Sequence, residues 1–118
     1  MVSGMMSVPV AATCAPIGAQ DIMMMHGEND DVLPWDGVPS GLYATLSVLG
    51  TFFLWRGVSD CPAIGIEQET RTSYSVTRTV RSVSSCRGGS RLRLDLIKKG
   101  GHQWPKFAAE EILDFFGL

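Results

Sequence analysis

A short run of apolar residues with no polar interruption constrains this chain most. Asp21 is followed by Ile22-Met23-Met24-Met25, and a strongly polar loop begins directly afterwards. A strand without polar residues on either side is typical of a parallel sheet whose two faces are both covered. A turn of buried helix could supply a similar run, but this segment is short and the following loop is abrupt. We therefore expect a buried strand over 21–25.

Two segments repeat apolar residues at helical spacing. Residues 40–58 predict a helix, with Ser40 as its N-cap and Gly57 at its end. Residues 107–116 predict a short amphipathic helix that closes the chain. Residues 1–20 contain small residues and prolines without a periodic pattern, so they predict an irregular N-terminal segment.

Two further segments alternate between polar and apolar residues. The alternation over 72–80 and again over 91–97 predicts two half-exposed strands that pair with each other. Residues 82–90, rich in Ser and Gly, predict the turn between them, and residues 59–70 predict a loop.

The composition is that of one ordinary globular domain over 118 residues, with 45% hydrophobic and 19% charged residues. No apolar run is long enough to span a membrane, and residues 1–16 lack the basic start of a signal peptide. The net charge of −2 gives no general case for a nucleic-acid or membrane partner. Eight of the ten basic residues lie in 71–99, and we expect them to form a solvated face, not a phosphate-binding patch.

The polar loops after two predicted strands carry the residues best suited to chemistry. The loop 26–37 follows the buried strand and is acidic, while the loop 100–105 follows the strand 91–97 and contains His102. Ligands of open α/β sheets bind at the carboxyl ends of the strands. An aspartate that orients a histidine, which in turn activates a hydroxyl, forms a charge-relay triad. Asp30 and His102 occur in the order acid, then histidine, that α/β-hydrolases use.

A metal site that uses His26 and His102 is the competing interpretation of these loops. The chain has no close ligand spacing such as His-x-x-x-His, so we expect neither a metal ion nor an organic cofactor.

The two loops together resemble a known enzyme family. The sequence from His26 to Gly37, a Phe- and Trp-containing segment that runs into Cys61, then Cys86, and finally Gly100-Gly101-His102-Gln103-Trp104-Pro105 are similar to the C-terminal part of the polyhydroxybutyrate depolymerase and feruloyl esterase group. These are secreted serine esterases of the α/β-hydrolase fold. The resemblance covers nearly the whole chain and implies an α/β domain over 1–118. Its mostly parallel sheet would be flanked by helices and would lack its upstream strands.

The resemblance also implies roles for individual residues. Asp30 matches the triad aspartate, with Asp31 and Asp36 as rivals, and His102 matches the triad histidine. Cys61 and Cys86 match a cysteine pair that would form a disulfide, and Trp104 and Trp35 would line the substrate site. His26 belongs to the motif and is expected to be structural.

The nucleophile of the family is missing from this sequence. No Gly-x-Ser-x-Gly motif occurs, and the context of Ser3 resembles a later strand. We therefore expect a fragment that would act on an ester, in a secreted parent protein, only with a serine from outside the chain. The alternative is a non-catalytic remnant that associates with itself through an exposed sheet edge.

Overall fold

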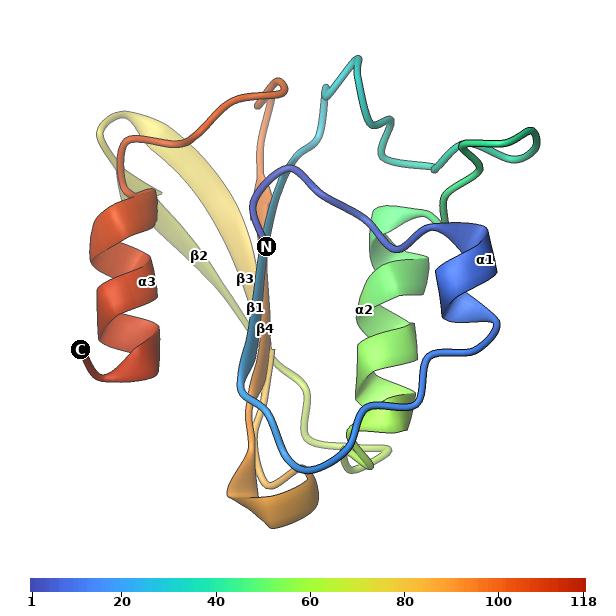
Figure 1. The fold of residues 1–118 in the computed structure, drawn as a ribbon. Helices are drawn as coiled ribbons and strands as arrows, with labels where there is room; N and C mark the ends of the chain where they lie inside the picture. Colours follow the sequence, from blue (N-terminus) through green and yellow to red (C-terminus); the bar gives the residue numbers. More distant parts are fainter.

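The apolar run forms the strand β1, as the sequence predicts, and this strand is buried along most of its length in the computed structural model of residues 1–118. Helices lie on both faces of the sheet to which β1 belongs (Figure 1). Along the chain, the elements are α1 (Val8–Ala11), β1 (Ile22–Gly27), α2 (Val48–Val58), β2 (Glu67–Ser73), β3 (Val76–Val83), a short 3-10 turn (Arg87–Gly89), β4 (Leu92–Ile97) and α3 (Ala108–Phe116).

The sheet is mixed, and the expectation of a mostly parallel α/β-hydrolase sheet is wrong. Its strand order is β1-β4-β3-β2, and only β1 and β4 run parallel, with Met24 opposite Leu94. The β4–β3 and β3–β2 pairs are antiparallel. The reason is the length of the connections: β2 joins β3 by a tight turn, and β3 joins β4 by a short loop, whereas parallel neighbours need a long crossover.

The turn between β2 and β3 lies inside the segment predicted as one strand. Tyr74 and Ser75 both have positive φ, at 52° and 61°, which is the geometry of a two-residue hairpin turn. Tyr and Ser are not residues that usually mark such a turn, so the alternation over 72–80 predicts one continuous strand instead. β2 instead begins at Glu67, in a stretch predicted as a loop.

The helix α2 is shorter than predicted. It begins at Val48, where the Ser47 hydroxyl accepts a hydrogen bond from the Gly50 amide at 2.9 Å. Upstream of this cap the backbone pairs elsewhere, since the Thr45 amide donates to the Val38 carbonyl at 3.0 Å. The C-terminal helix α3 is confirmed.

Two hydrophobic clusters fill the space between the layers. On one face, α2 contributes Val48 and Phe52 to a cluster with Met24 and Leu94. On the other face, α3 packs with the opposite side of the same strands, in a cluster of Met23, Met25, Ile97, Phe107, Ala108 and Phe115. Figure 1 shows α3 on one side of the sheet and α1 and α2 on the other.

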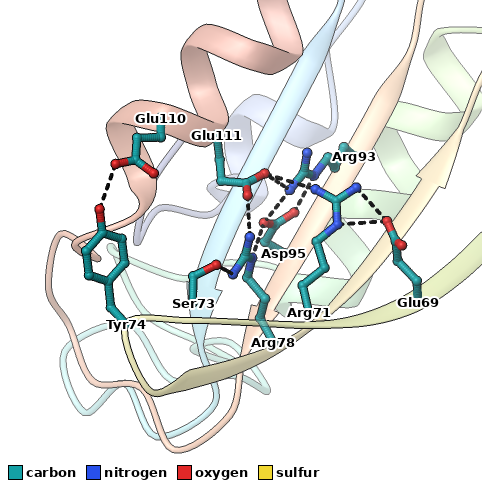
Figure 2. Close-up of polar contacts among 9 residues, drawn as sticks. All are labelled: Glu69, Arg71, Ser73, Tyr74, Arg78, Arg93, Asp95, Glu110 and Glu111. Atoms are coloured by element: carbon teal, nitrogen blue, oxygen red, sulfur yellow. Dashed lines mark hydrogen bonds and ion pairs between the residues drawn. The ribbon is translucent and has the colours of Figure 1, made fainter.

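An ion-pair cluster joins α3 to the sheet, so the expectation of a solvated basic face is wrong for Arg78 and Arg93 (Figure 2). Both arginines bind the fully buried Asp95 of β4, with Nε–O distances of 3.1 Å and 2.6 Å respectively. Both also bind Glu111 of α3, at 2.6 Å in the case of Arg93. Two guanidinium groups thus face two carboxylates, which compensates their removal from water.

Candidate functional site

The carboxyl ends of β1 and β4 lie side by side, because the two strands are parallel neighbours. The loops that follow them are joined by backbone hydrogen bonds, from the Glu28 amide to the Ile97 carbonyl at 2.9 Å and from the Asn29 amide to the Gly100 carbonyl at 2.8 Å. The backbones approach so closely at Gly27 that a side chain there would collide with Gly100. This contact holds the acidic loop against the histidine loop.

Asp30 is fixed in the acidic loop by its own backbone. Its Oδ1 accepts hydrogen bonds from the amides of Val32 and Leu33, at 2.9 Å and 2.8 Å. Its Oδ2 lies 2.9 Å from Nδ1 of His102. The structure therefore brings together the two residues predicted to act as a pair, and it leaves Asp30 only 4% exposed.

The surroundings of Asp30 favour its ionised form. Burial raises the pKa of the carboxyl group, but the hydrogen bonds from Leu33, His102 and Val32 and the charge of His102 together lower the pKa below its ordinary value. The carboxylate is thus a stable acceptor for a proton on Nδ1 of His102.

His102 lines a pocket, and the loop that carries it ends at a residue packed in the core. Its side chain is 38% exposed, and it lines a pocket of about 310 Å³ together with Val2, Ser3, Gln103 and Trp104. Nε2, the nitrogen that does not face Asp30, makes no hydrogen bond within the chain. Downstream, the loop ends at the buried Phe107, whose ring lies 4.1 Å below the Arg78 guanidinium.

The two tryptophans predicted to line the site lie in different places. Trp104 lines the His102 pocket and is 64% exposed. Trp35 does not line that pocket; its ring lies edge-on to the imidazole of His26, with 6.2 Å between the centroids, and it packs on the α2 cluster.

Ser3 is a pocket residue that the sequence did not indicate. Its Oγ donates to the Gln103 carbonyl at 3.2 Å, and its φ of 49° is unusual for a residue other than glycine. It reaches this edge because Val2 forms a parallel bridge with Met25. No periodic pattern near the N-terminus predicts this isolated bridge between Val2 and Met25.

The other candidate acids stand apart from His102. Asp31 and Asp36 are exposed and make no hydrogen bond to either histidine.

His26 is fully buried, with Nε2 2.9 Å from the Leu33 carbonyl and 3.5 Å from Oδ2 of Asp30. No group of three or more His, Cys, Asp or Glu side chains is arranged to hold a metal ion.

The expected pair of cysteines is bonded. The Cys61–Cys86 disulfide joins the segment after α2 to the turn before β4, while Cys14 is a free thiol. None of the helices combines the length and the apolar character that a membrane crossing requires.

A second pocket, of about 270 Å³, lies beside α3 and is lined in part by Arg71, Arg91 and Arg93. Each of these guanidinium groups already binds a carboxylate, and Glu67 and Asp114 also line the pocket. It therefore offers no uncompensated positive charge to an anion.

Comparison of the chain with known protein families, with characterised proteins and with solved structures gives no significant match.

Proposed function

We propose that Asp30 and His102 are the acid and the general base of a carboxylic-ester hydrolase, of the type that the loop motifs resemble. The observation that carries the proposal is the 2.9 Å contact between Asp30 Oδ2 and His102 Nδ1, with the other imidazole nitrogen left for the pocket. Two residues 72 positions apart meet in the geometry that charge relay requires.

In this mechanism Asp30 stays ionised and accepts a hydrogen bond from Nδ1–H, which fixes the tautomer of His102. The lone pair of Nε2 takes the proton of a serine hydroxyl as its oxygen attacks the ester carbonyl carbon. The imidazolium then returns the proton to the departing alkoxide, which leaves an acyl-serine. Water activated by the same nitrogen hydrolyses the acyl-serine in the second half-reaction. No metal ion or organic cofactor takes part.

The serine would come from outside these residues, since the sequence contains no Gly-x-Ser-x-Gly motif. The decisive experiment is to determine the nucleotide sequence upstream of the Met1 codon in the same frame. The longer polypeptide that it encodes is then expressed. Hydrolysis of a p-nitrophenyl ester of a short-chain acid is the assay.

We expect the longer polypeptide to hydrolyse the ester, Asp30→Asn to lower kcat by about 10⁴-fold, and His102→Ala to lower it by about 10⁶-fold. Asp31→Asn is the matched control, because Asp31 is exposed and does not contact His102, and it should leave the rate unchanged. Full activity with His102→Ala would contradict the assignment of the general base. Turnover by residues 1–118 that disappears with Ser3→Ala would contradict the external nucleophile.

The disulfide supports an oxidising compartment for this esterase, as expected for a secreted protein.

The alternative function, self-association through a sheet edge, has weaker support. The outer strand β2 carries exposed Glu67 and Glu69, and charged residues on an edge strand oppose pairing with another sheet. Sedimentation velocity tests it: a dimer that forms with rising concentration, without ester hydrolysis in any form of the protein, would favour this alternative.

A further inference from the structure

Two histidines approach the same carboxylate oxygen of Asp30. Oδ2 lies 2.9 Å from Nδ1 of His102 and 3.5 Å from Nε2 of His26. The two imidazoles differ in environment, since His26 is fully buried and His102 is partly exposed. Only His102 lines the pocket, so His26 would not meet a substrate directly.

The partners of His26 determine which of its nitrogens carries the hydrogen in the neutral ring. Nε2 lies 2.9 Å from the Leu33 carbonyl oxygen, which can only accept a hydrogen bond. Nδ1 is buried and has no partner. A hydrogen on Nδ1 would be a buried donor without an acceptor, and the lone pair of Nε2 would then face two acceptor oxygens. The Nε2–H tautomer avoids both penalties.

In that tautomer His26 links the parts of the loop that enclose Asp30. Its Nε2–H donates to the carbonyl of Leu33, with Asp30 Oδ2 also nearby, while the amide of Leu33 donates to Oδ1 of Asp30. The edge-on contact with Trp35 restrains the imidazole ring from the other direction. Movement of His26 would therefore change the orientation of the carboxylate.

We infer that His26 is a positioning residue, which acts through Asp30 by holding Oδ2 toward Nδ1 of His102. The inference rests on the proposed function, because it gives His26 a role in the same acid–base pair. The contacts of His26 support it: Nε2 lies between the Leu33 carbonyl oxygen and Oδ2 of Asp30, and Trp35 restrains the ring.

Two substitutions separate positioning from packing. The side-chain amide of His26→Gln reaches the place of Nε2 and can donate to Leu33, whereas that of His26→Asn reaches only as far as Nδ1. The readouts are the melting temperature, the downfield proton resonance of His102 Nδ1–H, and the nitrogen NMR spectrum of His26 in the unsubstituted protein. Asp30→Asn serves to assign the His102 resonance, which it should remove.

We expect the Nε2–H tautomer for His26, a His102 resonance that persists in His26→Gln, and loss of that resonance in His26→Asn at a similar melting temperature. An Nδ1–H tautomer, or an unchanged resonance in His26→Asn, would overturn the inference. Where His26→Asn does not fold, the wild-type tautomer and the His26→Gln spectrum decide alone, and loss of the resonance in folded His26→Gln overturns it. These spectra do not require ester hydrolysis, so a failure of the proposed function is distinguished from a failure of His26 positioning.

Discussion

A Cβ atom at Gly27 would lie 2.3 Å from the carbonyl oxygen of Gly100, so the loops after β1 and β4 touch backbone to backbone. This contact requires glycine at position 27. The contact joins the loops that carry Asp30 and His102, so the geometry of the pair depends on two residues that take no part in the chemistry.

Gly27→Ala should therefore separate the two loops and destabilise the fold by roughly 2–3 kcal/mol, because the obstacle is backbone and cannot rotate away. Urea denaturation measures this change in the free energy of unfolding. Gly101→Ala, at a position with open space around it, is the control and should cost less than about 1 kcal/mol. Equal effects of the two substitutions would argue against a close contact at Gly27.

The ion-pair cluster allows a comparison of two adjacent glutamates. Glu111→Gln removes the charge that faces Arg78 and Arg93, and we expect a loss of roughly 3 kcal/mol because both arginines remain buried. Glu110→Gln affects only the exposed contact with Tyr74 and should cost less than about 1 kcal/mol. Thermal unfolding followed by circular dichroism measures both. Similar melting temperatures for the two variants would mean that the cluster does not hold α3.

Acid should weaken the fold through Glu111 and Asp30. Burial raises the pKa of Glu111, but its hydrogen bond to Arg93 and the charges of Arg93, Arg78 and Arg71 lower it below the ordinary value of 4.5. The pKa of Asp30 is likewise below its ordinary value of 3.8. Groups with lowered pKa values contribute stability above their unfolded pKa and lose that contribution as the pH falls through the folded one. The free energy of unfolding should thus decrease below about pH 4.5, and Glu111→Gln should flatten this dependence.

The disulfide closes a segment of 25 residues, and its removal should lower the free energy of unfolding by roughly 3.5 kcal/mol. The double substitution Cys61→Ala with Cys86→Ala tests this by urea denaturation. Cys14→Ser is the control for the loss of a thiol, because Cys14 is not bonded. A double variant as stable as the control would show that packing alone fixes the turn before β4.

The sequence pattern predicts those helices and strands whose conformation depends mainly on their own residues. The uninterrupted run of β1 and the amphipathic repeat of α3 were both predicted correctly. The strand topology was predicted only in part. The pairing of the segments 72–80 and 91–97 is confirmed by β3 and β4. The strand β2 was missed, because the turn at Tyr74 and Ser75 has no glycine or asparagine to mark it. That hidden turn converts one expected strand into a hairpin and gives the sheet its antiparallel half.

The candidate site, like the fold, could be predicted only where the local sequence indicates it. The loop motifs indicated Asp30 and His102, and the parallel pairing of β1 and β4 brings them within hydrogen-bond distance. Buried Arg78 and Arg93 could not be expected from sequence, since their burial depends on Asp95 and Glu111 arriving from separate elements. The contribution of Ser3 to the pocket likewise depends on a tertiary bridge.

The strand order also has a consequence for folding. β2, β3 and β4 are consecutive and joined by short connections, so this meander closes only small loops as it forms. β1 joins β4 across a much longer segment, as shown by Asp21 and Arg91, which pair although they are 70 positions apart. Because the entropy of closure grows with loop length, we expect β1 to dock after the meander. The candidate acid and base would then meet only in molecules that have completed the last step of folding.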